Sequence, residues 1–353
     1  MAWFRNNPPS GNAQRGGTAV LLVNLGTPQA PTARAVRSFL ARFLRDRRVV
    51  DLPPLLWWPL LYGLVLPLRP YRSARAYRKI WTAQGSPLAH FTAELARKLQ
   101  ARIDAVGPRR MRVAYAMCYS APGVAAGLRA LAASGCDRLV VLPLYPQHSS
   151  STTGSVFDQV ARELARWRRV PELSFVSHYC DHPAYIEALA ASVRTHWANA
   201  TARAPLLFSF HGIPARSVTQ GDPYFEQCHE TARLVADSLG LARGAWSVSF
   251  QSRFGRTQWL EPGTGDELIA HARRGADRIA VLAPSFAVDC LETLEEIAIG
   301  YRELFLAAGG RDLQYIPALN ACDEHVRALL EVVGEHVGGR REAALEPRKH
   351  AAR

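Results

Sequence analysis

A histidine stands at the end of an apolar run, where an imidazole could act as a base or as a metal ligand. Residues 206–210 have the continuous apolar character of a buried strand. Gly212 and Pro214 follow His211, and they permit a tight bend and end strand pairing. Open α/β sheets bind ligands at this end of their strands, and imidazole exchanges protons near neutral pH. His211 is therefore a candidate general base; the alternative is a histidine that only completes a loop.

A row of carboxylates follows a second predicted strand, residues 279–282. Asp289, Glu292 and Glu296 are spaced three and four apart, which places them on one face of a helix. Helix capping explains Asp289 and Glu292, because acids are favoured in a first turn, but it does not explain Glu296. Such a row could accept protons or hand over a divalent cation. We expect Glu292 to face His211 across a cleft.

A loop rich in hydroxyl groups follows a third predicted strand, residues 139–144. Hydroxyls and backbone amides before a helix can hold an anionic oxygen. The alternative is a capping loop, although a cap needs only one such residue. The pattern favours an anion or carboxylate site, formed by the six residues Ser149, Ser150, Ser151, Thr152, Thr153 and Ser155.

The segments that must position these loops recur in two similar halves. Residues 18–25 and 206–210 are both apolar strand patterns followed by Gly-x-Pro. Residues 135–143 and 275–283 both begin with Gly-x-Asp-Arg and continue into an apolar strand. Helix-length amphipathic segments alternate with these strands, as in parallel sheets. The sequence predicts an α/β fold of two Rossmann-like, doubly wound domains with parallel sheets and an active-site cleft between them.

The predicted organisation follows from this duplication. The first residues are rich in Asn, Pro and Gly, which is typical of a loose leader, and the last are basic and rich in Ala and Gly. We expect a leader (1–17), an N-terminal domain (18–170) that carries an insertion (34–99) and is completed by a C-terminal helix (321–337), a C-terminal domain (171–320) and a flexible tail (338–353).

The insertion carries an apolar segment next to a basic one. Residues 52–68 hold no charge, but four prolines argue against a spanning helix, which needs about 20 residues. An apolar segment beside a cationic helix face suits an anionic membrane surface, so residues 52–79 are a candidate membrane-contacting lip. In the alternative, Trp57 and Trp58 cover the cleft and the arginines face water. The basic face consists of Arg69, Arg72, Arg75 and Arg78.

Composition and charge limit the partners. A chain of 353 residues is long for one core, which agrees with two domains. The net charge of +13 suits an anionic membrane or an acidic small substrate. Nucleic acid is not expected, because no recognition motif for it is present. The six cysteines lack CxxC pairs and no signal peptide precedes them, so we expect no disulfide framework and a cytoplasmic location, with peripheral contact at the inner face of the membrane.

These residues together resemble the ferrochelatase family of class II chelatases. The resemblance runs from Ala19 to about Val333. It implies two Rossmann-like domains around a porphyrin cleft, and the insertion of Fe²⁺ into protoporphyrin IX with release of two protons to form haem. It rests on LLVNLGTP (21–28), GSPL (85–88), LPLYPQHSSSTTGS (142–155), LFSFHGIP (207–214), QSRFGRTQWLEPGT (251–264) and PSFAVDCLETLEEI (284–297).

The same resemblance implies roles for individual residues. The family's catalytic histidine falls on His211 and its acidic partner on Glu292, and both also belong to the implied metal site. Glu296 and Asp289 extend an acidic path, whose next member is replaced by Gly300. Cys118 stands where relatives commonly have arginine. Porphyrin contacts are expected from Leu25, Tyr119, Ser149, Ser151, Thr152, Thr153, Phe250 and Trp259.

The expected substrates are Fe²⁺ and protoporphyrin IX, with no tightly bound cofactor. Some members of the family hold a [2Fe–2S] cluster through C-terminal cysteines, but no cysteine follows Cys322 here, so none is expected. One alternative is a related cobalt or nickel chelatase that acts on another tetrapyrrole. Another is a non-catalytic haem or porphyrin carrier, which has no use for a carboxylate opposite the histidine. A dinucleotide-dependent oxidoreductase would need a glycine fingerprint that the chain lacks.

Overall fold

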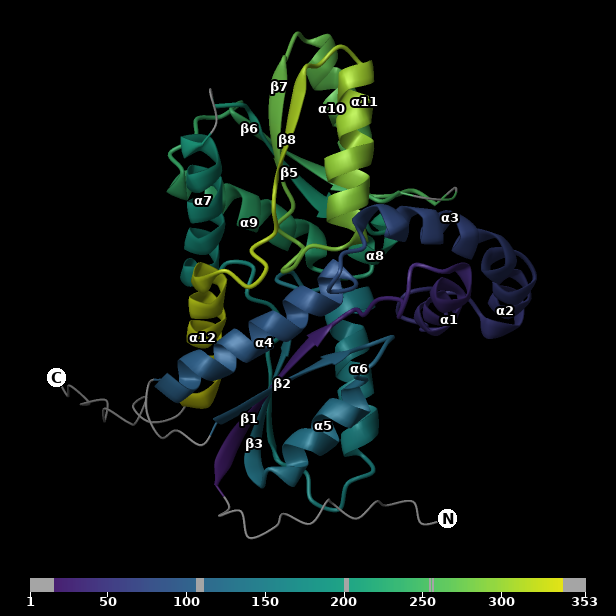
Figure 1. Ribbon diagram of the computed structural model, residues 1–353, viewed down its shortest axis with the longest axis vertical. Helices are drawn as coiled ribbons and strands as arrows, with labels where there is room; N and C mark the ends of the chain where they lie inside the picture. Colours follow the sequence, from purple (N-terminus) through teal and green to yellow (C-terminus); the bar gives the residue numbers. More distant parts are fainter. Residues whose placement is uncertain (1–15, 106–110, 200–202, 254, 256, 339–353) are drawn as a thin grey trace, which may run out of the picture.

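Two parallel sheets organise the chain in the computed structural model (Figure 1). The structure describes residues 16–105, 111–199, 203–253, 255 and 257–338. The first sheet has the strand order β2-β1-β3-β4 and the second has β6-β5-β7-β8, so both halves have the same arrangement of four strands. Every paired strand in them is parallel. The predicted α/β fold with two similar halves is confirmed.

The first sheet is buried on both faces by helices. Its central strand is completely apolar from Ala19 to Val23, and these side chains are 0% exposed, as parallel strands covered on both faces require. The strands are β1 (Gly17–Asn24), β2 (Met111–Met117), β3 (Cys136–Pro143) and β4 (Glu172–Phe175), and the helices are α4 (Pro87–Ala105), α5 (Val124–Ala133), a short π-helix η2 (Ser150–Gly154) and α6 (Ser155–Leu164).

The second sheet repeats this plan around β5, whose Leu207, Phe208 and Phe210 are fully buried. The strands are β5 (Leu206–His211), β6 (Trp246–Gln251), β7 (Arg278–Leu282) and β8 (Asp312–Ile316). The helices of this half are α7 (Pro183–Ala198), α8 (Ala215–Thr219), α9 (Tyr224–Ser238), α10 (Thr264–Arg273), the π-helix η3 (Glu292–Tyr301), α11 (Arg302–Ala307) and α12 (Asp323–Gly338).

Two predicted boundaries are wrong. The second half was expected to begin at residue 171, but β4 pairs with β3 and so belongs to the first sheet. The insertion was expected at 34–99, but α4 packs on β2 and is the ordinary crossover helix of the first sheet. The predicted leader and tail lie outside the described residues, apart from Gly16, Gly17 and Gly338. Of these, Gly17 begins β1 and Gly338 ends α12.

The true insertion is a group of helices that we call the lid, residues 33–80. Figure 1 shows it projecting from the side of the molecule. A five-residue π-helical segment begins at Leu61, two residues after Pro59, where an α-helix cannot continue its hydrogen bonds undisturbed. Within the described part of the chain, no helix is both long and apolar enough to cross a bilayer. The lid contains α1 (Ala33–Phe43), α2 (Pro54–Leu60), the π-helix η1 (Leu61–Val65) and α3 (Leu66–Ile80).

Helix α12 joins the two halves. It packs against α4 of the first half and α7 of the second, and the three helices lie together in Figure 1. Its Val326, Leu329 and Val333 belong to a hydrophobic core that includes residues of both sheets. The helix was predicted to complete the N-terminal half, and in the structure it contacts both.

Candidate active site

His211 is the last residue of β5, and it is half-buried. Its ring nitrogen Nδ1 lies 2.7 Å from the carbonyl oxygen of Gly212. A carbonyl only accepts hydrogen bonds, so Nδ1 carries a proton, and in the neutral ring Nε2 keeps a lone pair. The backbone N–H of His211 donates to Ser285 Oγ at 3.2 Å, which ties the strand end to the loop after β7. The side chain is thus held in the tautomer that a base requires.

The backbone around His211 depends on Gly212. Its N–H donates to the carbonyl of Gln251 at 2.8 Å. A Cβ atom at this position would stand 2.7 Å from that same oxygen, which is a closer approach than side chains allow. Glycine therefore lets the end of β5 lie against the end of β6, as the predicted bend requires.

Gln251 connects the strand that carries His211 with the helix that carries Glu292. Gln251 is the register partner of His211 across β5 and β6, and it is fully buried. Its Oε1 accepts from the hydroxyl of Ser209 at 2.8 Å, which leaves Nε2 to donate to the backbone carbonyl of Glu292 at 2.9 Å. The first residue of η3 is therefore held at the edge of the sheet where β5 ends.

The half-buried Glu292 faces the lid. Burial lowers the pKa of Arg69 on α3, and the carboxylate of Glu292 opposes that shift. Burial likewise raises the pKa of Tyr77 far above its ordinary value, and Glu292 adds to that increase. The ammonium of Lys79 on α3 forms an ion pair with Glu295 at 2.9 Å. The lid therefore lies over the first turn of η3.

Glu296 is the third acid on η3, after Glu292 and Glu295, and four groups hold its carboxylate. The donors are the N–H of Ser252 at 2.8 Å, its hydroxyl at 2.5 Å, the hydroxyl of Tyr301 at 3.0 Å and the amide of Gln251 at 3.3 Å. A π-helix bonds residues five apart, so Tyr301 lies beside Glu296 on its surface. Ser252 has a φ of 61°, a left-handed conformation that is uncommon outside glycine and often occurs at functional sites.

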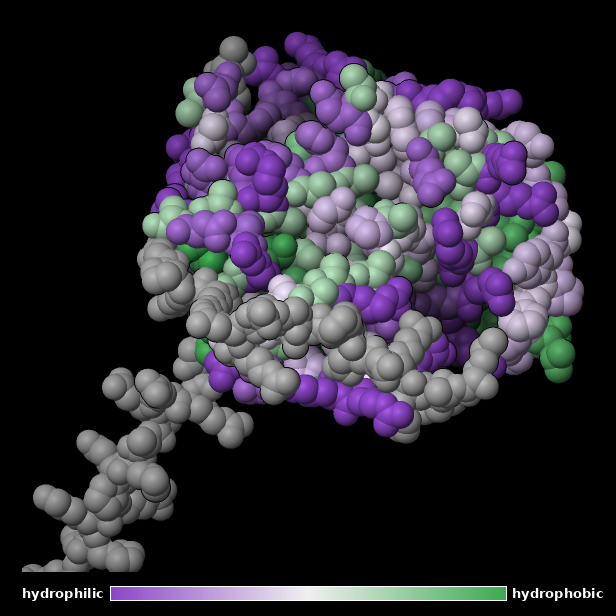
Figure 2. Space-filling model, turned by 60° about the horizontal axis from the view of Figure 1, so that its bottom comes forward, coloured by the Kyte–Doolittle hydropathy of each residue, from purple (hydrophilic) through white to green (hydrophobic). Residues whose placement is uncertain are grey.

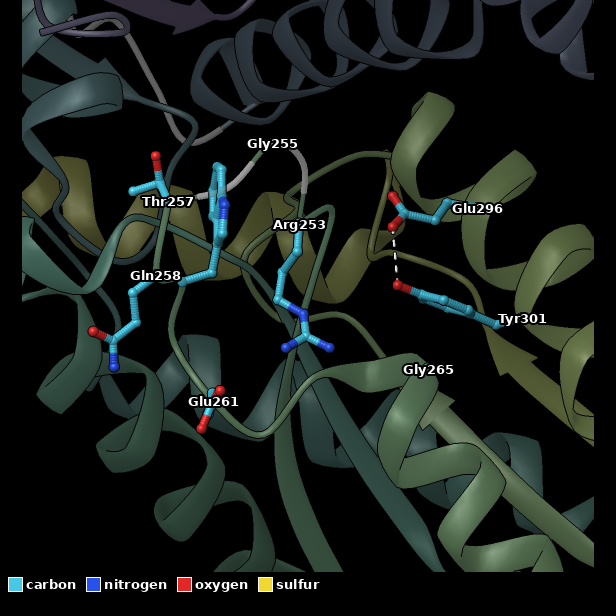
Figure 3. A pocket seen from close by; sticks show the side chains of 9 residues that line it. Arg253, Gly255, Thr257, Gln258, Glu261, Gly265, Glu296 and Tyr301 are labelled. Carbon is cyan, nitrogen blue, oxygen red and sulfur yellow. Dashed lines mark hydrogen bonds between the residues drawn. The ribbon is translucent and has the colours of Figure 1, made fainter.

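Glu296 and Tyr301 line a cavity of about 480 Å³. Figure 3 shows their side chains hydrogen-bonded on one side, with Arg253 and Glu261 across from them. Arg253 also pairs with Asp266. A space lined by charged and polar side chains thus adjoins the carboxylate four residues beyond Glu292. Its further lining residues are Gly255, Thr257, Gln258, Trp259 and Gly265.

Asp289 does not belong to the acidic path, and that prediction is wrong. It is 4% exposed and precedes η3. Its carboxylate accepts hydrogen bonds from Tyr315 at 2.6 Å, Asn320 at 2.7 Å and Thr293 at 2.9 Å. Asp289 therefore anchors the loop before η3 to the loop after β8, and its carboxylate is engaged by these internal partners.

The hydroxyl-rich loop does hold a carboxylate, but one that belongs to the protein. The carboxylate of Asp222 accepts from the hydroxyl of Ser149 at 3.0 Å and from the N–H of Ser150 at 2.7 Å. Ser151 and Thr152 bond back to Ser149, and Thr153 is completely buried. The Ser149 hydroxyl thus has an internal carboxylate as its partner, which argues against the predicted contact of Ser149 with porphyrin.

The remaining predicted porphyrin residues lie in different surroundings. Phe250 is 0% exposed and stacks on Phe225 inside the core, so its predicted contact with porphyrin is wrong. Tyr119 is buried beneath the lid, where its hydroxyl donates to Asp46 at 2.7 Å. Leu25 is half-buried and packs against the lid core, and Trp259 lines the cavity next to Glu296. Of this group, Leu25 and Trp259 are the two best placed to meet a ligand.

Sequence reasoning missed Gln251, Ser252 and Asp222 as parts of the site. Gln251 carries a signal that could have revealed it, because it directly follows a buried strand, as His211 does. Parallel neighbours end at the same sheet edge, so a polar residue there is expected near the histidine. The pairing of Asp222 with a loop more than seventy residues away has no local signal.

Comparisons with known proteins show the family of the chain. A model of the ferrochelatase family matches residues 17–337. The ferrochelatase of Azoarcus sp. is 52% identical over 338 residues, which cover 96% of this chain and 93% of that protein. The ferrochelatase of Nitrosococcus oceani is 51% identical over 326 residues, covering 92% of this chain and 88% of the relative. The solved structure of SirB from Bacillus subtilis with Fe³⁺ shares the fold, with a TM-score of 0.54, 11% identity, and coverage of 91% of this chain and 95% of SirB.

Proposed function

The chain belongs to the ferrochelatase family, and from this premise we propose which of its residues carry out the reaction. The protein is an enzyme that inserts Fe²⁺ into protoporphyrin to form haem and releases two protons. Those protons sit on pyrrole nitrogens in the plane that the metal must enter. The reaction therefore needs a base close to the macrocycle, and a site that holds the macrocycle in a reactive shape.

His211 is the base in this proposal. The observation that carries it is the 2.7 Å bond between Nδ1 and the Gly212 carbonyl, because this bond keeps the lone pair on Nε2. The residue is half-buried at a strand end, so a bound macrocycle and the imidazole can meet without water between them. Nε2 accepts a pyrrole proton and thereby frees the ring nitrogen for Fe²⁺.

Glu292 and Glu296 carry the proton away in two steps. Gln251 donates to the backbone of Glu292 and to the carboxylate of Glu296, so one buried side chain sets the positions of both acids. Glu292 takes the proton from His211, and Glu296 passes it to water in the adjoining cavity. His211 and Glu292 together also guide the incoming Fe²⁺. In this proposal the acidic path consists of Glu292 and Glu296, without Asp289.

The porphyrin lies between the lid and the end of the second sheet in this proposal. Half-buried apolar side chains of Leu25, Leu291 and Leu294 gather with the lid core there and suit a flat apolar ligand. Arginines of α3 supply cations for its propionates. The proton transfers use side chains alone, so we expect no iron–sulfur cluster to take part.

The lid also rests on an anionic membrane in this proposal, which suits a substrate and product of low solubility. Green spheres at the right-hand edge of Figure 2 mark apolar side chains on the side where Figure 1 places α2. Grouped apolar side chains beside arginines favour an interfacial helix. The exposed apolar residues of this region are Leu52, Leu55, Leu56, Trp58, Leu60, Tyr62, Leu64, Leu68 and Tyr71.

The base role is tested by His211→Ala in anaerobic insertion of Fe²⁺ or Zn²⁺ into protoporphyrin, followed by absorbance. Loss of a positioned general base lowers the rate about 10²–10⁴-fold. We expect that drop together with a porphyrin affinity close to that of the wild type, measured by fluorescence quenching. His196→Ala is the matched control, because His196 is half-buried and bonds Gln314 far along the chain, and it should retain full activity.

Two results would contradict the proposal. Wild-type insertion rates in His211→Ala would leave the family assignment intact and remove the histidine from the mechanism. Loss of porphyrin binding in the same variant would show that His211 shapes the cleft and does not transfer protons.

A further inference from the structure

We propose that His178, Cys180 and Asp181 form a site for a divalent transition metal, separate from the active site. These residues lie in the loop between β4 and α7. Each offers one donor atom, and the three donors lie within 4.8 Å of one another. None of them takes part in the proton transfers proposed above.

The distances between the donors are close to those of a tetrahedral metal site. His178 Nδ1 is 3.6 Å from Asp181 Oδ1, and Cys180 Sγ is 3.8 Å from that nitrogen and 3.9 Å from that oxygen. Bonds of about 2.0–2.3 Å in a tetrahedral array place N, O and S ligands about 3.3–3.6 Å apart. Small side-chain rotations that shift the donor atoms by a few tenths of an ångström therefore bring all three within bonding distance of a metal ion.

The backbone that carries the donors is held before any metal binds. The N–H of Tyr179 donates to the Pro146 carbonyl at 2.9 Å, and the hydroxyl of Thr231 donates to the Cys180 carbonyl at 2.8 Å. Tyr179 is 2% exposed, and its ring packs edge-on against Tyr185. Metal binding therefore orders little more than three side chains, which lowers its entropic cost.

The donor set indicates the class of metal. A thiolate, an imidazole and a carboxylate suit Zn²⁺, Co²⁺ or Fe²⁺, whereas Mg²⁺ and Ca²⁺ prefer oxygen ligands alone. The thiolate of Cys180 and the carboxylate of Asp181 neutralise a divalent ion. The filled site therefore carries no net charge, although Cys180 is buried. The side chains of His178 and Asp181 are 40% and 55% exposed, which leaves a fourth position open to water.

Co²⁺ is the probe that tests the site, because a thiolate ligand produces a charge-transfer absorption in the near ultraviolet. We expect this band at one Co²⁺ per chain in the full-length protein without porphyrin, and its loss on addition of Zn²⁺. Cys180→Ser should abolish the band. His178→Ala and Asp181→Asn should each weaken Co²⁺ binding more than about tenfold.

Two controls separate this site from others in the chain. Cys322→Ser changes a different cysteine, which is only partly buried, and His211→Ala disables the proposed active site. Both variants should keep the band at full intensity. The proposal is overturned if wild type shows no band at millimolar Co²⁺, if the band persists in Cys180→Ser, or if either control removes it.

Discussion

Gly212 is the residue that lets His211 present an unprotonated nitrogen. Its N–H donates to the Gln251 carbonyl, and its own carbonyl accepts the hydrogen bond from His211 Nδ1. The first of these bonds requires a close approach between the ends of β5 and β6. A Cβ atom on residue 212 would lie 2.7 Å from the Gln251 oxygen. The position of His211 therefore depends on a glycine directly after it.

Gly212→Ala tests this dependence. The clash involves backbone, which cannot rotate away, so we expect a loss of about 1–3 kcal/mol in unfolding free energy by urea titration. The insertion rate should fall more than the stability loss alone explains, because the imidazole loses its orienting carbonyl. Gly334→Ala in α12 is the control: its Cβ meets nothing within 4 Å, and the change should be neutral or stabilise by about 0.5–1 kcal/mol. Equal effects of the two substitutions would contradict this account.

Residue types and spacing identified His211 and Glu292 as candidates but misplaced several of their neighbours. Asp289 and Ser149 have the polarity of ligand-binding residues, yet their partners are Asn320 and Asp222 from distant parts of the chain. Local spacing shows that a polar residue needs a partner and does not show which partner the fold supplies. The predicted porphyrin contact of Phe250 was wrong for a different reason. A strand residue before a polar loop can face the core, and the sequence does not show which way it points.

At the scale of elements, the lid combines an apolar outer surface with polar ties to the body of the protein. Arg48 forms a two-bond ion pair with Asp158 at 2.6 and 2.9 Å, and Lys79 pairs with Glu295 at 2.9 Å. These ion pairs are partly exposed, so each contributes only weakly to holding the lid against the body of the protein. The inner face of the lid is apolar, with Phe39 and Leu40 buried. Packing therefore holds the lid, and its outward leucines are available to a membrane.

The double variant Leu55→Asp, Leu56→Asp tests the membrane contact. These side chains are 88% and 70% exposed, so the folded state should be nearly unaffected. Burying a leucine contributes about 1.5–3 kcal/mol, and sedimentation with anionic vesicles should show affinity reduced at least about tenfold. Zn²⁺ insertion into detergent-dispersed porphyrin should remain at the wild-type rate. Val170→Asp, an exposed apolar residue outside the lid, is the control and should bind vesicles normally. Unchanged vesicle binding by the double variant would contradict the proposal that the lid contacts a membrane.

The central strands β1 and β5 were predicted well because apolar runs that end in glycine and proline leave few alternatives. The prolines of residues 52–68 argued only against a membrane-spanning helix, and they gave no sign that the chain continues helically from Pro54 to Ile80 with a π-helical segment after Pro59. The extent of the insertion was misjudged. An amphipathic helix such as α4 has the same pattern whether it covers a sheet or belongs to a lid, and only its packing on β2 distinguishes the two.

At the scale of the whole molecule, α12 contains a buried ionisable group at the junction of the halves. His325 is 0% exposed, and its Nδ1 donates to the Asn320 carbonyl at 2.6 Å. Its Nε2 is buried and has no hydrogen-bond partner among the described residues. Burial lowers the pKa of His325 to about 4, from an ordinary value of 6.5. The folded protein therefore keeps this ring neutral in mild acid, where the unfolded chain protonates it.

This shift predicts a loss of stability on acidification. The unfolded state binds the proton first, so the stability is intact above pH 6.5 and declines as the pH falls toward 4. The shift corresponds to roughly 3 kcal/mol across that interval. Urea unfolding at a series of pH values should show the decline in wild type and a shallower one in His325→Leu. Equal slopes in the two proteins would rule out His325 as the cause.

The duplication of the sheets could be read from the sequence, since matching motifs recur in the same order in both halves. The way the halves are joined could not. Helix α12 contacts α4 and α7 through ordinary apolar side chains, and such side chains fit any helix with a complementary face. Which surfaces meet depends on shape across segments more than a hundred residues apart, and periodicity carries no information about it.

The position of α12 also has a consequence for biosynthesis. In the described part of the chain the last strand ends at Ile316, and the helix that joins the halves begins only at Asp323. Domains fold as units while the chain is made, at about 5–20 residues per second, and both sheets are synthesised before α12 is. A chain interrupted between Ile316 and Asp323 contains both sheets but leaves apolar surfaces of α4 and α7 uncovered. Such a product is a substrate for chaperones and proteases, because exposed apolar surface makes a chain prone to aggregation.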